Sequence, residues 1–590
     1  MNSGLYGCFR LDGGPVDAQA CKALGLAPTA DPTLSGLALS GVALGVDRVD
    51  PNAVSLVTAG ADLCILLGYL DEAEALAREL GLAVETPAAA LAHAAYRRFG
   101  EDTPAHLVGE WSCLIWRPSE RQLCLMTSRA IRDPVLFAVR ANQVVVAPSI
   151  HQLRGVAWIG RDLDPEGFLA RVSTFRARRE LDSPTLLRGV EMLGPGRCLT
   201  IRADGSACHR VADLPVDAAW QGSFEEAVRA SEALLRRVIR QRLARRPRAA
   251  LFLSGGLDSS LLCWLAASER GAGQTIEFFT SAAPEGSGLQ DETEFAALVA
   301  DRLGVRLHRV APPAEANVYR PSERHFLSVN EPARTTWHYL YEAFLAACMA
   351  ADLPFLIDGA NGEYTVSAQA PLATPTFRAR GWLRGARTRL RGASGPQWPV
   401  DAFHGRLSPS LLARASQTME ANWRRPMPAD HPFEARRPWG YRMGVDRLVL
   451  HTTQRLGGDV RADAPFRDER LLRLYSGFPG AFSAWRGVPR APVRAMLRGN
   501  VPDVIVTRPK GIPFCPDFRQ RMRRQSGEAL ARLPAFRKTG LGDWVDVDWL
   551  EVQLQLIGAA ETLTIPHAFR VQMTANLAEF LMWWMGEDQR

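Results

Sequence analysis

The feature that most constrains the fold is a glycine-rich loop, Ser254 to Ser260, set between a short apolar run and a helical segment. Residues 249–253 are consecutive apolar residues, which predicts a buried strand, and residues 259–268 predict a helix. The alternation continues, with strands expected at 276–280, 305–310 and 354–357 and helices at 291–303 and 339–351. Strands that alternate with helices predict a parallel, doubly wound α/β sheet.

The loop has the chemistry of an anion-binding turn at the carboxyl end of a strand. Gly255 and Gly256 allow a tight turn, and the N-terminus of the following helix offers unpaired N–H groups to an anion. Hydroxyl donors are added by Ser254, Ser259 and Ser260. Asp258 would repel a phosphate unless it binds Mg²⁺, which prefers oxygen ligands. Because the Gly-Lys-Ser/Thr ending of a Walker A loop is missing, we predict a pyrophosphate site and no γ-phosphoryl transfer.

The length of 590 residues exceeds one ordinary core and predicts two domains. Residues 1–210 have recurrent strand-like runs separated by polar turns, which predicts a β-rich domain, and the turn-rich stretch 204–215 is typical of a linker. Strands are expected at 111–116, 122–126 and 143–147, with a helix at 71–80.

The second predicted domain covers residues 220–590. Ser223 is a candidate N-cap, followed by acidic residues and then by apolar residues at helical spacing, which predicts a helix at 225–244. Residues 376–437 are rich in Arg and Pro and are expected to be an insertion, after which the chain is mostly helical.

Composition excludes several classes of protein. Hydrophobic residues make up 47% and charged residues 23%, the balance of a globular chain. The ten cysteines form no CxxC pair, which argues against a zinc site or disulfide framework and favours the cytoplasm. No apolar run has the length of a membrane span and no export signal is recognisable, so we expect no membrane partner. The net charge of +7 is mild for this length. With no zinc or thiol-relay cysteine pattern, a nucleic-acid partner is not expected.

Lysine is rare in this chain, with only Lys22, Lys510 and Lys538. Arginine supplies nearly all other positive charge. Because the compact, titratable ammonium is not interchangeable with a guanidinium, a lysine kept in this background is a candidate for a chemical role.

Several segments together are similar to asparagine synthetases and their relatives, the β-lactam synthetases and lasso-peptide macrolactam synthetases. The loop Ser254-Gly255-Gly256-Leu257-Asp258-Ser259-Ser260 resembles the family's SGGxDS loop. Residues 330–363 resemble its DEP…D/S-G-x-G-x-D segment, 461–471 its R-x-PFLD stretch and 494–514 its K-x-x-LR…R-x-K-x-G run. Gly4-Leu-Tyr-Gly7 is similar to the start of the family's glutaminase domain. The likeness extends over nearly the whole chain.

The resemblance implies an Ntn-type, glutaminase-like αββα domain followed by an ATP-pyrophosphatase domain. In the implied reaction a carboxylate attacks the α-phosphate of ATP, Mg²⁺-pyrophosphate leaves, and an amine attacks the acyl-adenylate. Asp258 and Glu363 would be the Mg²⁺ ligands, with Glu363 standing where the family usually has Asp. The adenine and ribose would be contacted by Leu253, Ser281 and Gly359.

Two cations complete the implied site. Lys510 matches the lysine that, in β-lactam synthetases, stabilises charge while the amide closes, and an ammonium beside the α-phosphate would offset developing negative charge. Arg508 either supports the same charge or forms a salt bridge, and the sequence leaves both alternatives open.

The N-terminus departs from the family. An active glutaminase needs a cysteine directly after the initiator Met, whereas this chain has Asn2, with Ser3 in the aligned position. Cys8 lies within the predicted first strand and is expected to be a small core residue. We therefore expect an inactive glutaminase domain and an amine that is not glutamine-derived ammonia.

A second departure concerns amine deprotonation. β-Lactam synthetases have a tyrosine three residues before the metal-binding acid, where this chain has Ala360, flanked by Asn361 and Tyr364. An α-amine is more easily deprotonated near neutral pH than an alkyl ammonium. A lasso-type macrolactam synthetase joins a peptide's N-terminal amine to an Asp or Glu side chain. Of the family's reactions, this one is the most compatible with Ala360. The implied partners of such an enzyme are a precursor (core) peptide, a leader peptidase and a leader-binding protein.

The sequence leaves alternatives open. One is a small-molecule amide or β-lactam synthetase or an ammonia-dependent synthetase, and another is a non-catalytic scaffold. The arginines of 378–391 and 424–437 could line a peptide cleft or form a solvated surface. A tRNA-modifying relative is the weakest alternative, because no zinc or thiol-relay cysteine pattern accompanies the basic stretch.

Overall fold

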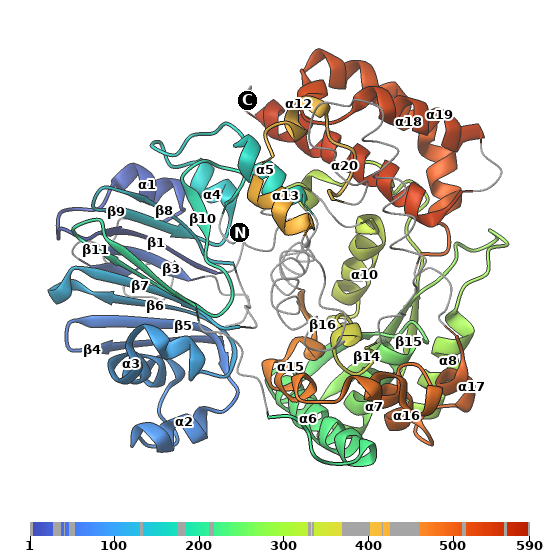
Figure 1. Ribbon diagram of the computed structural model, residues 1–590, viewed down its shortest axis with the longest axis horizontal. Helices are drawn as coiled ribbons and strands as arrows, with labels where there is room; N and C mark the ends of the chain where they lie inside the picture. Colours follow the sequence, from blue (N-terminus) through green and yellow to red (C-terminus); the bar gives the residue numbers. More distant parts are fainter. Residues whose placement is uncertain are drawn as a thin grey trace.

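The fold is described from a computed structural model, in which the chain forms two lobes (Figure 1). The description covers residues 4–26, 37–39, 42–46, 53–129, 134–173, 184–211, 218–328, 332, 336–368, 402–415, 417–424, 460–509, 515–559 and 563–587. Ser3, Lys510 and most of the predicted insertion 376–437 lie outside these residues.

The N-terminal lobe contains two six-stranded antiparallel sheets. The first has the order β10-β8-β9-β1-β3-β2, with bounds Val190–Met192, Leu136–Arg140, Gln143–Ala147, Leu5–Arg10, Val42–Val46 and Leu37–Leu39. The second has the order β12-β11-β7-β6-β5-β4, with bounds Ala207–Val211, Arg197–Arg202, Gln122–Thr127, Gly109–Arg117, Asp62–Leu70 and Val54–Ala59.

The two sheets and their helices form four layers (Figure 1). Apolar side chains that alternate along the strands, such as Phe9, Ile65 and Leu125, fill the space between the sheets. The outer face of the second sheet is covered by α2 and α3, with bounds Ala73–Leu80 and Ala88–Phe99. The outer face of the first packs on α1, α4 and α5, with bounds Ala18–Ala23, Ile150–Arg154 and Pro165–Val172. This is the αββα arrangement expected from the sequence.

The second lobe is built on a parallel five-stranded sheet of order β15-β14-β13-β16-β17. Its strands have the bounds Leu307–Val310, Thr275–Ser281, Arg248–Phe252, Phe355–Ile357 and Arg461–Asp463. The connecting helices are α6, α7, α8 and α10, with bounds Phe224–Arg245, Leu257–Glu269, Thr293–Leu303 and His338–Ala350. One face of the sheet packs on α6, α7 and α8 and the other on α10, which confirms the predicted doubly wound architecture.

The start of this lobe follows the predicted helix signal. Ser223 caps α6: its Oγ accepts a hydrogen bond from the Glu226 N–H at 3.2 Å, and the Glu226 carboxylate accepts one from the Ser223 N–H at 2.7 Å. The predicted linker is partly wrong, because Ala207–Val211 form strand β12, paired with β11. The polar turn at 204–206 is a hairpin turn rather than the start of a linker.

In the described residues after the insertion, which begin at residue 460, the chain is mostly helical, as expected, and strand β17 precedes the helices. Helices α15, α16 and α17 lie below the parallel sheet beside α6 and α7 in Figure 1. Helices α18, α19 and α20 lie above it beside α10. The bounds of these six helices are Glu469–Ser476, Ala491–Leu497, Asp503–Thr507, Phe518–Lys538, Val547–Ala559 and Ile565–Glu587. The described parts of the insertion add α12 and α13, with bounds Pro409–Leu412 and Gln417–Arg424.

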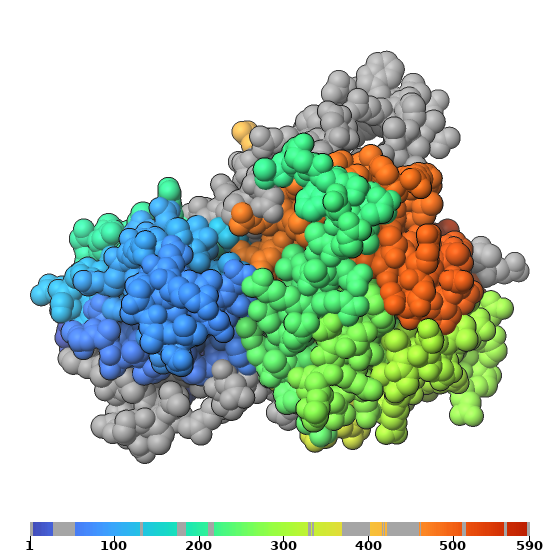
Figure 2. Space-filling model, turned by 90° about the horizontal axis from the view of Figure 1, so that it is seen from below, coloured from blue at the N-terminus to red at the C-terminus, as the bar shows by residue number. Residues whose placement is uncertain are grey.

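The two lobes are joined by a buried network of ion pairs, and the N-terminal residues lie directly against the second lobe in Figure 2. Arg242 of α6 is 1% exposed and lies 3.2 Å from Glu110 of β6 and 3.6 Å from Asp468. The network consists of Arg242, Arg245, Arg246 and Arg470 with Asp71, Glu110, Asp463 and Asp468. Six of these eight side chains are buried and Arg245 and Arg470 are partly exposed, and the paired charges fix one lobe on the other.

Candidate active site

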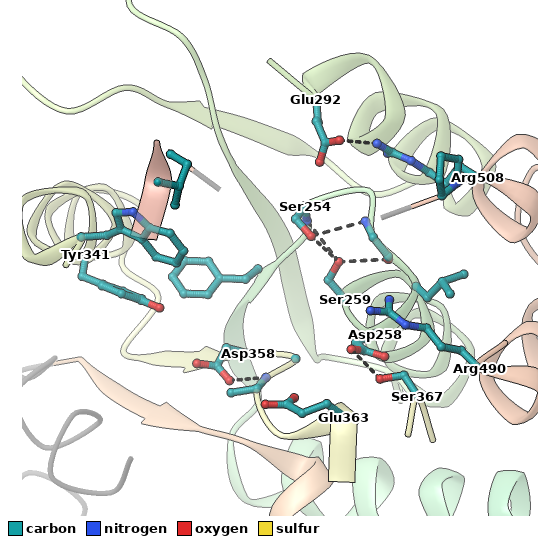
Figure 3. A pocket seen from close by; sticks show the side chains of 18 of the residues that line it. Ser254, Asp258, Ser259, Glu292, Tyr341, Asp358, Glu363, Ser367, Arg490 and Arg508 are labelled. Atoms are coloured by element: carbon teal, nitrogen blue, oxygen red, sulfur yellow. Dashed lines mark hydrogen bonds and ion pairs between the residues drawn. The ribbon is translucent and has the colours of Figure 1, made fainter. Parts of the chain in front are cut away.

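The candidate site lies where the strand order of the parallel sheet reverses. The chain adds β14 and β15 on one side of β13, and β16 and β17 on the other. Ligands of doubly wound sheets bind at such a switch point, outside the carboxyl ends of the strands. The loop Ser254–Ser260 follows β13, and Asp358 and Gly359 follow β16. Both segments line one cavity of about 680 Å³ (Figure 3).

The shape of the glycine loop depends on Gly255. Its φ of +68° is in the left-handed region, and a Cβ there would lie 2.6 Å from Cβ of Phe295 on α8. The serines hold the turn: Ser254 N–H donates to Ser259 Oγ at 3.2 Å, and Ser259 Oγ donates to the Gly256 carbonyl at 3.2 Å. The loop is therefore a fixed turn that presents the N-terminus of α7 to the cavity.

The turn after β16 brings a second acid to the loop. A Cβ on Gly359 would lie 3.1 Å from the Ser259 amide nitrogen, and one on Gly362 would lie 2.7 Å from the Asp258 carboxyl carbon. Close approach at both glycines places Glu363 beside Asp258. The two side chains lie below the loop in Figure 3. These two residues are the predicted metal ligands, and the structure brings them to the same cavity.

The Asp258 carboxyl is held on one side only. Its Oδ2 accepts a hydrogen bond from Ser367 Oγ at 2.9 Å, whereas its buried Oδ1 has no hydrogen-bond partner among the described residues. Burial raises the pKa of Asp258 to about 6, the negative charge of Glu363 adds to the shift, and Ser367 and Arg490 oppose it. A carboxylate in this environment is stabilised by a bound cation.

The Arg508 guanidinium contacts other residues of the protein. Its guanidinium forms an ion pair with Glu292, donates to the Gly255 carbonyl at 3.2 Å and stacks 3.7 Å from the ring centroid of Phe295. The structure thus shows a salt bridge at Arg508, and its role in supporting charge during the reaction stays a prediction. These contacts brace the glycine loop, while Arg508 also lines the cavity.

Arg490 is a second cation at the cavity, directly before α16. It has a left-handed backbone, with φ +56° and ψ +42°, which is uncommon for a residue with a side chain. Its charge acts on Asp258, and Figure 3 shows its guanidinium on the same side of the cavity. Arg490 is therefore placed to contact an anion held by the loop.

The charge of the cavity indicates what it can bind. Among the described residues, four acids line it, Asp258, Glu292, Asp358 and Glu363, against two arginines, Arg490 and Arg508. A polyphosphate would be repelled by this excess of carboxylates without a divalent cation. No cluster of three or more metal-ligating side chains occurs in the described part of the chain, but Mg²⁺ is usually held by one or two carboxylates together with substrate phosphates. Asp258 and Glu363 fit such an ion.

The opposite end of the cavity is apolar and largely aromatic. It is lined by Phe252 of β13, by Trp337 and Tyr341 at the start of α10, and by Ile565 and Phe569 of α20. The ring centroids of Phe252 and Tyr341 are 6.0 Å apart, and those of Trp337 and Phe569 are 5.7 Å apart. These ring contacts join side chains of β13, α10 and α20 into an apolar wall of the cavity.

Most of the predicted site residues meet in this cavity. Its lining includes Ser254, Gly256, Leu257, Asp258, Ser259, Gly359, Glu363 and Arg508, and Ala360 lies among them. Gly255 supports the loop from behind, and Leu253, Ser260 and Ser281 are buried at the strand and helix ends without lining the cavity. Their assigned contacts with adenine and ribose stay predictions. Lys510 lies outside the described residues, directly after the lining residue Pro509, and its role also stays a prediction.

Several lining residues were not singled out from the sequence. Glu292, Ser367 and Arg490 come from three separate segments and reach the site only through packing of the sheet against α8 and α16. Asp358 was part of a quoted motif without a role, and its Oδ1 accepts a hydrogen bond from the Ala360 N–H at 2.8 Å. Gly487 and Pro489 indicate a turn near Arg490, but they do not predict that an arginine takes the left-handed position or that it reaches the cavity.

Comparison with known proteins agrees with this geometry. Residues 230–344 match the family model described as asparagine synthase, and this segment contains the glycine loop, α7 and most of α10. The match supports the asparagine synthetase superfamily as the origin of this domain. It does not distinguish lasso-type enzymes from other members.

Two curated fungal proteins are also similar. "Amidase chry2" of Gibberella zeae is 29% identical over 245 residues, which cover 38% of this chain and 35% of that protein. "Amidase chyE" of Penicillium rubens is 26% identical over 243 residues, which cover 38% of this chain and 34% of that protein. The aligned part is thus well under half of either relative.

Solved structures give only weak likeness. A glutamine phosphoribosylpyrophosphate amidotransferase from B. subtilis, complexed with ADP and GMP, and a structure described as the allosteric regulatory enzyme of purine biosynthesis both share 12% identity at a TM-score of 0.23. Both alignments cover 55% of this chain, and they cover 63% and 71% of those chains. A TM-score this low carries no argument about the fold. In the described part of this chain, no helix combines the length and the apolar character that a bilayer span requires.

Proposed function

We propose that this protein is an ATP-dependent, AMP-forming amide ligase. One observation carries the proposal: a pyrophosphate-type loop and two acids share one cavity at the switch point of a doubly wound sheet. The asparagine synthase match over residues 230–344, which includes the loop and Asp258, supports it. The loop N–H groups and serine hydroxyls would hold the β- and γ-phosphates, and Asp258 and Glu363 would hold Mg²⁺, which offsets the charge of the leaving pyrophosphate.

The substrate's own amine is the proposed acceptor. Cys8 lies in the middle of β1 and is 3% exposed. A hydrogen bond with Cys21 and burial both raise the pKa of the Cys8 thiol, so it is unsuited to act as a glutaminase nucleophile. Without glutamine-derived ammonia, the amine has to arrive with the substrate or as free ammonia. We infer a peptide whose N-terminal amine attacks its own adenylated Asp or Glu side chain, the reaction of a lasso-type macrolactam synthetase.

The proposed partners follow from this chemistry. A precursor (core) peptide would be the substrate, supplied by a leader peptidase and a leader-binding protein. Ala360 lines the cavity and has no proton-accepting side chain, which favours an α-amine over a more basic alkyl amine. The alternative is a small-molecule amide synthetase, β-lactam-forming or ammonia-using, and it differs in the compound that triggers ATP cleavage.

The test uses synthetic peptides with a free N-terminus and an internal Asp or Glu. ATP should be cleaved to AMP and pyrophosphate only with peptide present, and the peptide should lose one water. The N-acetylated peptide is the matched control: it should still support ATP–pyrophosphate exchange but lose no water. Amide formation from aspartate and free ammonia, without peptide, would contradict the macrolactam proposal and favour the ammonia-dependent alternative.

Lys510 has a separate expected signature. If its ammonium stabilises charge as the amide closes, Lys510→Met should slow water loss from the peptide by about 10²- to 10³-fold. ATP–pyrophosphate exchange should fall much less, because it reports only the earlier adenylation. Lys538→Met, on the last turn of α18, is the matched control. Equal loss of both activities in Lys510→Met would assign Lys510 to nucleotide binding instead.

A further inference from the structure

The aromatic end of the cavity has no role in holding the nucleotide as derived above. Its five lining residues, Phe252, Trp337, Tyr341, Ile565 and Phe569, carry no charge and come from β13, from the start of α10 and from α20. Trp337, Tyr341, Ile565 and Phe569 line the cavity and are only partly buried. Large apolar side chains kept partly exposed inside a concave site are typical of a ligand subsite.

The wall lies on the other face of the sheet from Leu253, one of the residues expected to contact adenosine. Phe252 packs in the cluster on the α10 face of the sheet, beside Phe344 at 4.3 Å between ring centroids. Leu253, the next residue, belongs to the cluster on the opposite face with α6 and α7. Alternate residues of a strand point to opposite faces, so the chain directs Phe252 and Leu253 to different sides. The aromatic wall is thus not an extension of the Leu253 side of the site.

The geometry of the proposed displacement assigns an occupant to this end. A nucleophile attacks a phosphoryl group in line with the bond that breaks, so the attacking carboxylate lies opposite the pyrophosphate. The pyrophosphate end is defined by the glycine loop, Asp258 and Arg490. Figure 3 shows Tyr341 on the opposite side of the cavity from Asp258 and Arg490, with Glu363 between. The group that carries the attacking carboxylate therefore reaches the aromatic wall.

We propose that Phe252, Trp337, Tyr341, Ile565 and Phe569 form a subsite for an apolar, preferably aromatic, side chain of the carboxylate substrate, next to the carboxyl that is adenylated. The inference rests on the proposed function and specifies its substrate class. It gives the ligase a preference for peptides in which the reacting Asp or Glu has a large apolar neighbour. One large apolar group in such a pocket changes specificity by about tenfold or more.

The experiment measures ATP–pyrophosphate exchange with capped dipeptides as defined probes: acetyl-Trp-Asp-amide and acetyl-Asp-Trp-amide, each against its glycine counterpart. In the wild-type protein, kcat/KM should be at least about tenfold higher for one tryptophan probe than for its glycine counterpart. Ile565→Trp, which fills the wall, should lower that ratio to about two or less. Val552→Ala, an apolar residue of α19 that is 51% exposed and lies outside the cavity, is the control and should keep the wild-type ratio.

The outcomes separate this inference from the proposed function. Equal rates for tryptophan and glycine probes in the wild-type protein would overturn the subsite while leaving the ligase intact. A rise in the KM for ATP in Ile565→Trp, with the probe ratio retained, would overturn it in favour of an adenine-binding wall. If no probe supports exchange, binding of the same probes is measured directly by calorimetry. Equal affinity of wild type and Ile565→Trp for the tryptophan probes would then refute the subsite.

Discussion

The cavity and the interface between the lobes are both rich in charge, but their charge balance differs. The interface is balanced, whereas acids outnumber arginines among the described residues that line the cavity. At the interface, Arg242 and its partners balance four positive groups with four negative groups. Burial opposes ionisation of Asp71 and Glu110, but the neighbouring arginines outweigh it and lower the pKa of both carboxyls. In the cavity, burial raises the pKa of Asp258 to about 6 and the charge of Glu363 adds to the shift.

This difference separates a structural charge cluster from a binding site. Each charged side chain of the interface network is paired with an opposite charge of the protein itself, so the network needs no ligand. Among the described residues, four acids and two arginines line the cavity, and one arginine, Arg508, is paired with one of the acids, Glu292. An excess of carboxylates over cationic side chains is typical of a site that binds a divalent cation together with its ligand. Variants of the two regions should therefore fail in different measurements.

The largest effect is expected for Asp258→Asn in the cavity. Loss of the carboxylate removes a proposed Mg²⁺ ligand, and ATP–pyrophosphate exchange should fall by about 10⁴-fold, or about 5.5 kcal/mol. The melting temperature should not fall, because the substitution replaces a buried carboxylate that lacks a full counter-charge with a neutral amide. Asp548→Asn, whose side chain is 89% exposed on α19, is the control and should keep full exchange activity. Normal exchange by Asp258→Asn would refute the catalytic assignment of the cavity.

Substitutions in the interface network should lower the free energy of unfolding. Arg242→Met leaves Asp71, Glu110 and Asp468 buried with one counter-charge fewer, which should cost about 3–5 kcal/mol of unfolding free energy. The measurement is denaturant-induced unfolding. Arg237→Met, on the same helix but 54% exposed, should cost less than about 1 kcal/mol. If both variants lose the same small amount, the network does not hold the lobes together.

A smaller effect is expected at Arg490, the cavity cation placed near Asp258. Arg490→Met should weaken the binding of Mg²⁺-pyrophosphate by about 10- to 100-fold, since one charge-assisted contact contributes about 1.5–3 kcal/mol. Arg490→Lys should recover part of the affinity. Arg486→Met is a close control, because Arg486 also has a left-handed φ, +52°, but is exposed and does not line the cavity. Calorimetric titration of pyrophosphate distinguishes them, and equal affinities for Arg490→Met and wild type would exclude Arg490 from the anion site.

The two regions also differ in how far sequence could predict them. The loop and its flanking elements, from β13 to β16, follow from local periodicity and glycine placement, and the structure confirms each of them. Asp258 could be proposed from the chemistry of the loop, and Glu363 from the resemblance of residues 330–363 to a family segment. The strand β17 was missed, since Arg461–Asp463 is three residues long, partly polar and pairs with β16 across about a hundred residues.

The interface network could not be predicted from any local pattern. Its members come from the end of β5 and from β6 of one lobe, and from β17 and from within or directly beside α6 and α15 of the other, and each alone is typical of a solvated charge. Charged residues are rarely buried, so burial of Arg242 appears only when the lobes are assembled. Arg490 and Glu292 were missed for the same reason, because tertiary packing rather than sequence spacing brings them to the loop.

The smallest predicted effect is a dependence on pH that follows from the raised pKa of Asp258. In the unfolded chain this carboxyl titrates near its ordinary value of 3.8, and in the folded chain near 6. The folded state therefore binds the proton more tightly, so stability is lost as the pH rises from about 4 to 6 and does not change further above that range. Without metal or nucleotide, Asp258→Asn should exceed wild type in melting temperature by about 2 °C at pH 8 and match it at pH 4. An equal difference at both pH values would show that the gain comes from altered packing rather than from removal of an unbalanced charge.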